Sequence, residues 1–351
     1  MSATTRITIR KPDDWHLHIR DGAMLAAVLP FTAHNFQRAI VMPNLVPPVT
    51  TTAEAAAYRA RVLAARPRGS SFTPLMTCYL RDDTDPDDVE RGFRDGVLTA
   101  VKFYPAHATT NSAAGVSDLG RVTAVLERMQ KIDMPLLLHG EVTDPDVDIF
   151  DREKVFIERT LTPLTRSFPG LRIVLEHLST REGAGFVMSA QPQVAGTITP
   201  GHLSQTRNDM LSGGIRPHLY AMPILKTAHD REALRRAATS GAPCYFLGTD
   251  SAPHTYSRKV SGCGAAGMFS APVAIETYAT VFDEEGALDR LEAFASVNGP
   301  AFYRLPPNTA TITLEKSSWT APEEIPAGDG DRTVVYRGGE KIAWQVVDRS
   351  G

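Results

Sequence analysis

The chain has 351 residues, of which 42% are hydrophobic and 22% are charged, and its formal net charge is −3. A chain of this length buries a large core without disulfides, and its slightly negative charge does not indicate nucleic acid or an anionic membrane as a partner. Its 3 cysteines are widely spaced, which predicts free thiols in a reducing compartment. Because we find no apolar leader and no run of about 18 apolar residues, we expect a cytoplasmic protein.

Short apolar runs alternate along the chain with longer stretches of helical periodicity. Eight of the runs have the length and continuous apolar character of strands buried on both faces. They cover residues 15–19, 38–42, 72–79, 98–103, 135–139, 172–177, 193–198 and 243–248. This alternation predicts an α/β fold, a parallel (β/α)8 TIM barrel. A doubly wound open sheet is the alternative, and it is disfavoured because no glycine-rich dinucleotide turn follows the first run.

The helices are expected at residues 52–65, 119–131, 151–167 and 230–240, with Thr51 or Thr52 as the N-cap of the first. Past about Pro306 the pattern changes to short runs between turns rich in Pro, Gly and Asp. We expect strands there at residues 310–314, 333–336 and 342–347. The sequence therefore predicts a barrel over residues 1–305 and a small β-rich extension, packed on the barrel, over residues 306–351.

Side chains with useful chemistry fall at the ends of these runs, where barrel enzymes keep their active sites. In the first run, His16 and His18 share one face of a strand and can converge on one metal ion. The other residues of this kind are Lys102, His139, His177 and Asp250. A single histidine at such a place is ordinarily structural, and this interpretation is kept for His34, His107, His202, His218 and His229. For the whole set together, a structural explanation is disfavoured.

The chemistry of the set narrows the choice of site. Neutral imidazole and carboxylate ligands suit zinc and similar divalent ions. An ammonium has no lone pair, but two nearby dications would depress the pKa of Lys102. The free amine could then react with carbon dioxide to form a carbamate, whose two oxygens can bridge two metal ions. Lys102 therefore favours a binuclear centre over a mononuclear one.

Six segments, in their order and spacing, resemble the motifs of the bacterial-type (class II) dihydroorotases of the amidohydrolase superfamily. They are DWHLHIR (14–20), VMPN (41–44), VKFYP (101–105), LLHGE (137–141), LEHLS (175–179) and GTDSAPH (248–254), and the likeness runs over roughly residues 7–305. This resemblance implies a hydrolase that interconverts N-carbamoyl-L-aspartate and L-dihydroorotate, the third step of de novo pyrimidine (UMP) synthesis. It also suggests a homodimer.

The resemblance further implies two Zn²⁺ ions per subunit. The ligands implied for the first ion are His16, His18 and Asp250, and those for the second are His139 and His177. Lys102, carboxylated on its side-chain nitrogen (N6-carboxylysine), and a hydroxide would bridge the two ions. Asp250 would also be the catalytic residue, taking a proton from the hydroxide and passing it to the leaving amide nitrogen.

The substrate carries a carboxylate, and Arg20, two residues beyond His18 and on the same face if the strand geometry continues, can bind it bidentately. Asn44 can add amide hydrogen bonds, and His254 is expected as a third contact of the carboxylate. The small polar loop 105–112 is similar to the family's mobile loop, in which Thr109 and Thr110 reach the substrate. The remaining substrate contacts that the resemblance implies are His139 and the main chain at Met222, Ala266 and Gly267. The last two residues belong to the glycine-rich stretch 261–267.

Three alternatives remain at this point. Hydantoinases and dihydropyrimidinases share the metal ligands, but their neutral ring substrates do not need a carboxylate clamp. A non-catalytic dihydroorotase-like protein that assembles with a partner would be expected to have lost a ligand, and none is missing. A mononuclear deaminase of the same superfamily would leave Lys102 without a role.

Overall fold

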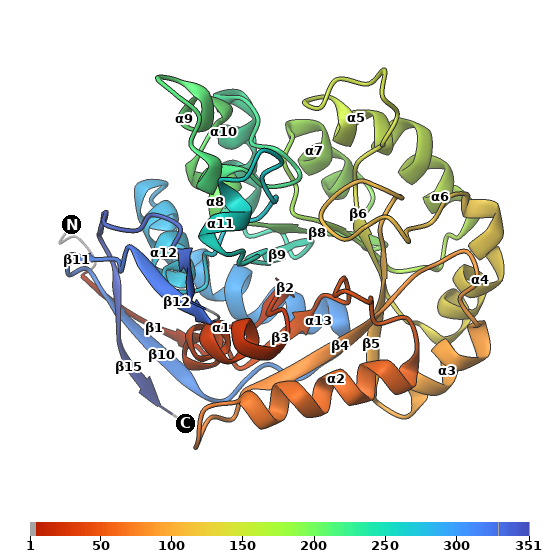
Figure 1. The fold of residues 1–351 in the computed structure, drawn as a ribbon, viewed down its shortest axis with the longest axis horizontal. Helices are drawn as coiled ribbons and strands as arrows, with labels where there is room; N and C mark the ends of the chain where they lie inside the picture. Colours follow the sequence, from red (N-terminus) through yellow and green to blue (C-terminus); the bar gives the residue numbers. More distant parts are fainter. Residues whose placement is uncertain (1–4, 329, 351) are drawn as a thin grey trace.

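The central element of the computed structural model, which describes residues 5–328 and 330–350, is a parallel sheet of eight strands in the order β2-β3-β4-β5-β6-β7-β8-β9. Its strands are β2 (Asp14–Leu17), β3 (Arg38–Val41), β4 (Thr73–Tyr79), β5 (Leu98–Phe103), β6 (Leu136–His139), β7 (Ile173–Glu176), β8 (Val194–Ile198) and β9 (Tyr245–Leu247). The helices lie around the outside of these strands (Figure 1). The predicted (β/α)8 barrel is confirmed.

The first and last strands meet beyond the end of β9, so the barrel closes there through the segment that follows this strand. The backbone N–H of Asp250 donates to the carbonyl of His16 at 2.9 Å, and that of His18 donates to the carbonyl of Ser251 at 3.0 Å. This seam brings the two ends of the predicted metal set together.

The α-helices of the described chain are α1 (Gly22–Asn35), α2 (Thr52–Ala65), α3 (Pro86–Arg94), α4 (Thr123–Ile132), α5 (Arg152–Phe156), α6 (Thr162–Ser167), α7 (Arg181–Ser189), α8 (Pro200–Ser204), α9 (Arg207–Leu211), α10 (Ala228–Ala238), α11 (Tyr256–Lys259), α12 (Ala274–Glu284) and α13 (Asn298–Tyr303). Thr51 caps α2 in a capping box with Glu54. The helix predicted over 151–167 is confirmed as one continuous helical segment, in which a π-turn (Ile157–Leu161) joins α5 to α6. Pro163 has no N–H to continue an α-helical ladder there. The helix predicted at 119 begins instead with a 3₁₀ turn, Leu119–Val122.

The barrel interior is filled by one apolar cluster, which lies below the site. Its members are Trp15, Ile40, Met42, Ala100, Leu137, Val174, Ala195, Phe246 and Tyr303. Tyr303 of α13 stacks on Trp15 with ring centroids 4.3 Å apart. Side chains two residues further along a strand point the same way. The next inward layer therefore contains polar residues, among them Lys102 after Ala100 and His139 after Leu137.

The C-terminal strands, together with the N-terminal strand β1, form three small antiparallel sheets. They are β1-β10-β15 (Arg6–Arg10, Thr311–Glu315 and Gln345–Ser350), β11-β14 (Trp319–Thr320 and Lys341–Ile342) and β12-β13 (Glu324–Gly328 and Asp331–Val334). The single strand predicted over 342–347 is wrong: β14 and β15 pair with different strands, and the buried Trp344 between them donates from Nε1 to Asp283 at 3.2 Å. The division of the chain after residue 305 remains a prediction.

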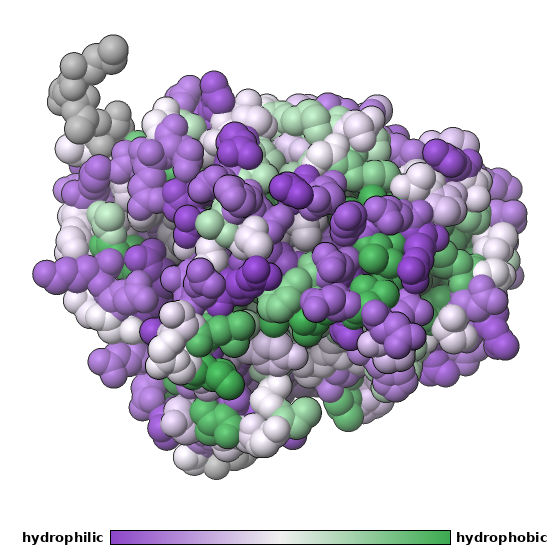
Figure 2. Space-filling model, turned by 90° about the horizontal axis from the view of Figure 1, so that it is seen from above, coloured by the Kyte–Doolittle hydropathy of each residue, from purple (hydrophilic) through white to green (hydrophobic). Residues whose placement is uncertain are grey.

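The surface is mostly polar on the face drawn in Figure 2, where hydrophobic side chains occur in small groups between hydrophilic ones. Of the helices in the described ranges, none combines the length and the hydropathy that crossing a bilayer requires.

Candidate metal centre and substrate pocket

A small cavity lies at the carboxyl ends of the barrel strands, directly above the apolar interior layer. Its volume is about 20 Å³, roughly the space of one water molecule. The lining residues are His16, His18, Arg20, Asn44, Tyr104, Thr109, Thr110, His139, His177, Met222, Asp250, Ala252, Ala266 and Gly267. The predicted site residues thus come together here, apart from Lys102, which lies beneath the cavity, and His254, which lies behind Arg20.

His16, His18 and Asp250 bring three ligand atoms together across the barrel seam. The Nε2 atoms of the two histidines lie 3.3 Å apart. Asp250 Oδ1 lies 3.3 Å from the Nε2 of His16 and 3.2 Å from that of His18. Asp250 has a left-handed backbone, with φ at 45°, a conformation that costs free energy in a non-glycine residue and is concentrated at functional sites.

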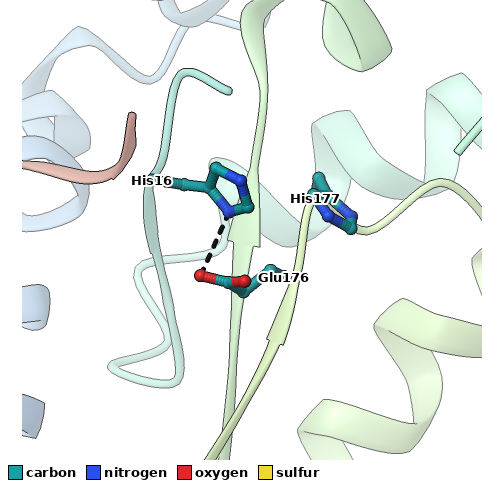
Figure 3. Close-up of side chains that lie close together, drawn as sticks. All are labelled: His16, Glu176 and His177. Atoms are coloured by element: carbon teal, nitrogen blue, oxygen red, sulfur yellow. Dashed lines mark ion pairs between the residues drawn. The ribbon is translucent and has the colours of Figure 1, made fainter. Parts of the chain in front are cut away.

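His177 and His139 face the cavity from the neighbouring strands β7 and β6. The ring of His177 lies 4.9 Å from that of His16 and 4.8 Å from that of His139, between centroids. His177 directly follows β7 and has a left-handed backbone, with φ at 44°. This turn brings a side chain beyond the strand back over the barrel axis, beside Glu176 (Figure 3).

Glu176 occupies the centre of the inward layer, between His16 and Lys102. Its Oε1 lies 3.0 Å from His16 Nδ1, the pair marked in Figure 3, and its other oxygen forms a fully buried ion pair with the Lys102 ammonium. Burial lowers the pKa of Lys102, and the charge of Glu176 opposes this shift. The lowered pKa brings the amine nearer to the neutral state that reacts with carbon dioxide.

The donor set fits divalent metal ions. Burial lowers the pKa of His18 to about 4 and holds that of His177 well below its usual range, so both imidazoles are in the neutral form that binds metals. His177 Nδ1 is buried without a hydrogen-bond partner in the described ranges. Ligand atoms of His16, His18 and Asp250, and of His16, Glu176 and His177, lie within 4.8 Å of one another in each group. Imidazole and carboxylate donors of this kind suit zinc-like ions.

Asp250 is also placed to exchange a proton. Burial raises its pKa, but the charge of His16 and a hydrogen bond from His18 outweigh burial and bring the pKa to about 2. The carboxylate is therefore ionised at neutral pH and can accept a proton from a neighbouring donor.

Arg20 faces the cavity by a different route from the one expected. Strand β2 ends at Leu17 and Arg20 has φ at 58°, so the extended geometry assumed for the stretch from His18 to Arg20 is wrong. The left-handed turn nevertheless leaves the guanidinium on the cavity wall, where its Nε donates to the carbonyl of Pro253 at 3.0 Å. Across the described part of the chain, no carboxylate lies within ion-pair distance of Arg20.

His254 stands between Arg20 and the glycine-rich loop. Its Nε2 lies 2.9 Å from Arg20 Nη2 and also 2.9 Å from the carbonyl of Ala266. Burial lowers the pKa of His254 to about 2, so the ring is neutral. One neutral nitrogen cannot both accept from Arg20 and donate to Ala266. A carboxylate that took over the Arg20 bond would therefore leave His254 free to donate.

The loop after β5 closes the cavity from above. Thr110 Oγ1 donates to the Ala266 carbonyl at 3.4 Å, and Asn44 Nδ2 donates to the Thr110 carbonyl at 3.1 Å. Asn111 Nδ2 donates in turn to the Asn44 carbonyl at 3.1 Å. The loop is thus tied to both walls, with Thr109 beside Thr110 in the lining and Met222 and Gly267 on the opposite side.

Sequence reasoning missed two carboxylates in this region. Glu176 follows the inward-facing Val174 by two residues, so strand periodicity was the signal that predicts its inward direction. Glu141 accepts a hydrogen bond from His139, with its Oε2 2.8 Å from His139 Nε2. Such a carboxylate orients an imidazole ligand. His202, assigned a structural role, has both ring nitrogens hydrogen-bonded, Nδ1 with Thr199 and Nε2 with the Pro223 carbonyl.

Comparison with known proteins agrees with this architecture. The amidohydrolase family model matches residues 13–319. A dihydroorotase of Sphingopyxis alaskensis is 59% identical over 344 residues, which cover 98% of this chain and 100% of that protein.

Two solved structures are similar throughout their length. A dihydroorotase of Campylobacter jejuni is 34% identical with a TM-score of 0.89, covering 99% of each chain. A dihydroorotase of Saccharomyces cerevisiae, in complex with 5-fluoroorotic acid, is 32% identical with a TM-score of 0.91, covering 98% of each chain. The chain therefore belongs to the amidohydrolase family and, within that family, to the dihydroorotases.

Proposed function

We propose that this chain is a metal-dependent hydrolase of a cyclic amide and that its substrate pair is L-dihydroorotate and N-carbamoyl-L-aspartate. The observation that carries the choice of substrate is Arg20. Its guanidinium lines the cavity beside the His–Asp cluster without a carboxylate of its own in the described part of the chain. A half-buried guanidinium on a cavity wall can bind a carboxylate through two parallel hydrogen bonds, and the carboxylate of dihydroorotate would supply that partner. The neutral rings of hydantoin or dihydrouracil have no such group.

The metal ligands are part of the same proposal. His16, His18 and Asp250 would hold one Zn²⁺, and His139 and His177 the other. Lys102 would bridge them after its amine adds to carbon dioxide, which forms an N–C bond and releases one proton. That reaction would remove the Lys102–Glu176 ion pair and leave Glu176 to orient His16. Bound divalent ions supply the Lewis acidity that activates water and polarises the ring carbonyl.

The protein's own groups would act on the substrate as follows. Arg20 binds the carboxylate, with Asn44 adding an amide hydrogen bond, and so aligns the ring over Asp250. Water adds to the ring carbonyl carbon, and Asp250 takes up a proton from it. The bond from that carbon to the ring nitrogen then breaks, and Asp250 returns the proton to the nitrogen. Ring closure runs through the same steps in reverse.

The loop contacts would exclude water during this reaction. Thr109 and Thr110 cover the cavity, while the main chain at Met222, Ala266 and Gly267 forms the opposite wall. Closure of such a loop strengthens the interactions inside the site.

The homodimer, the cytoplasmic location and the place in UMP synthesis remain predictions. Light scattering of the purified protein tests the homodimer.

The decisive experiment is ring opening of L-dihydroorotate by purified, zinc-loaded protein, with hydantoin and dihydrouracil as parallel substrates. Turnover of dihydroorotate alone is the expected result. Turnover of the neutral rings instead would overturn the substrate assignment and leave the metal proposal intact. Native mass spectrometry shows whether the protein holds two zinc ions and carries the carbamate. If such protein turns over none of the three substrates, the proposed function is overturned.

A further inference from the structure

Lys259, the last residue of α11, is a buried cation that the site described above does not use. Lys259 is only 4% exposed, and its Nζ donates to three backbone carbonyls. The acceptors are Tyr220 at 2.8 Å, Ala265 at 3.0 Å and Gly267 at 2.8 Å. These bonds use all three donors of the ammonium. A buried ammonium without hydrogen-bond partners would be strongly unfavourable. An ammonium whose three donors all find acceptors therefore indicates an organised site.

The three carbonyls belong to two segments that form one wall of the cavity. Tyr220 lies two residues before Met222, and Ala265 and Gly267 flank Ala266. A further bond joins the same segments, since the Gly267 N–H donates to the Tyr220 carbonyl at 2.9 Å. Gly267 has φ at 147°, and a Cβ there would lie 2.5 Å from the Ala252 carbonyl oxygen. The loop is therefore held on both sides, by Lys259 and by close packing against Ala252.

The bonds to Ala265 and Gly267 also decide where the carbonyl between them points. The carbonyls of Ala265 and Gly267 are directed at Lys259, whereas that of Ala266 is directed toward the side chains at the cavity. There it lies 2.9 Å from His254 Nε2 and accepts from Thr110 Oγ1 at 3.4 Å. One carbonyl thus serves as the contact point of the closing loop and of the Arg20–His254 pair.

We propose that Lys259 is a positioning residue for substrate binding, which orients the Ala266 carbonyl by holding the carbonyls on either side of it. Lys259 does not touch the substrate. It acts through the Ala266 carbonyl, which contacts Thr110 of the closing loop and His254, the partner of Arg20. This inference rests on the proposed function, because its readout is the binding of dihydroorotate.

The test is steady-state kinetics of Lys259→Met on dihydroorotate, in zinc-loaded protein with rates expressed per metal-loaded site. Methionine keeps the length of the side chain and removes all three donors. We expect KM to rise about tenfold and kcat to change less than about threefold, as for a loss of binding interactions. Lys259→Gln, which retains two N–H donors, should give an intermediate KM. Arg258→Met is the matched control, because Arg258 is the exposed neighbour on the same helix, and its KM should equal that of the wild type.

A double variant separates positioning from a general structural role. If Lys259 acts through the Ala266 carbonyl, Lys259→Met should raise KM by clearly less in a Thr110→Val background than in the wild type. The same increase in both backgrounds, or a fall in kcat with unchanged KM in Lys259→Met and Lys259→Gln, would overturn the inference. A wild-type enzyme that fails to open dihydroorotate would instead refute the proposed function, so the two failures are distinguishable.

Discussion

The carboxylate of Asp14 accepts hydrogen bonds from both the backbone N–H and the hydroxyl of Thr249, at 2.8 and 2.5 Å. Asp14 begins β2 and Thr249 directly precedes Asp250, so the pair bridges the seam between the first and last strands of the barrel. No ladder joins β2 and β9 in the described sheet. The Asp14 side chain therefore supplements the two backbone bonds that close the seam, from Asp250 to His16 and from His18 to Ser251, and it aligns His16 with Asp250.

Replacing the hydroxyl at this seam should weaken both the fold and the site. Thr249→Val keeps the side-chain volume but leaves a buried oxygen of Asp14 without its donor. We expect the free energy of unfolding to fall by about 1–3 kcal/mol and kcat to fall because Asp250 is displaced. Thermal denaturation and dihydroorotate turnover measure the two effects. Thr280→Val, whose hydroxyl bonds only to its own helix at the Glu276 carbonyl, is the control. Wild-type kcat in Thr249→Val would contradict the alignment role.

Loss of the Asp250 carboxylate should abolish turnover. Asp250→Ala removes both a metal ligand and the proton acceptor, and Asp250→Asn removes the acceptor while keeping the volume. We expect kcat to fall by at least about 100-fold in either variant. Stopped assays at high enzyme concentration measure the residual rate, and atomic absorption reports bound zinc. An Asp250→Asn protein with near-normal kcat would rule out the acid–base role.

The charge of Arg20 should govern affinity for the anionic ring. Arg20→Met removes the charge-assisted contact with the substrate carboxylate, and we expect KM for dihydroorotate to rise roughly 10–100-fold. Arg61→Met is the control, since Arg61 pairs with Asp21 at the surface and is 48% exposed. Equal KM values for wild type and Arg20→Met would refute the clamp.

Glu176 should be needed for metal loading. Glu176→Gln keeps the shape of the side chain but removes the negative charge that faces His16 and Lys102. Orienting partners of this kind contribute roughly 10–100-fold to metal affinity. We expect the variant to lose zinc at chelator concentrations that the wild type withstands. Unchanged zinc retention would limit Glu176 to a packing role.

A carboxyl group far from the site should make stability depend on pH. Burial raises the pKa of Glu276 on α12 from 4.5 to about 7, and its Oε2 has no partner among the described residues. The folded chain therefore keeps a proton that the unfolded chain releases. The contribution of this retained proton to the free energy of unfolding is fully present below pH 4.5. It is lost as pH rises toward 7, and the loss amounts to up to about 3 kcal/mol.

Glu276→Gln should remove this dependence, because glutamine does not titrate. Melting temperatures of wild type and variant, taken from pH 5 to pH 8 at fixed zinc, provide the comparison. We expect the variant to gain stability relative to the wild type as pH rises. A constant difference across that range would show that Glu276 does not titrate there.

The barrel and most of the candidate ligands could be predicted from local pattern. A buried parallel strand is a continuous apolar run, and a polar residue at its end marks the open face of a barrel. This is why the sequence pattern alone places His16, His139 and Asp250 in one site. Arg20 lies on the predicted wall of the cavity, but a left-handed turn, and not the expected extended strand, directs it inward.

Local periodicity and capping were enough to predict the eight buried strands, their order and several of the helices between them. Which distant groups meet depends on the tertiary fold. The pairing of N-terminal β1 with β10, the Asp14–Thr249 seam and the three carbonyls around Lys259 all join segments far apart in the chain. Such contacts depend on barrel closure and on the inward or outward register of each strand. No local pattern encodes them, because a shift of one residue reverses every side chain on a strand.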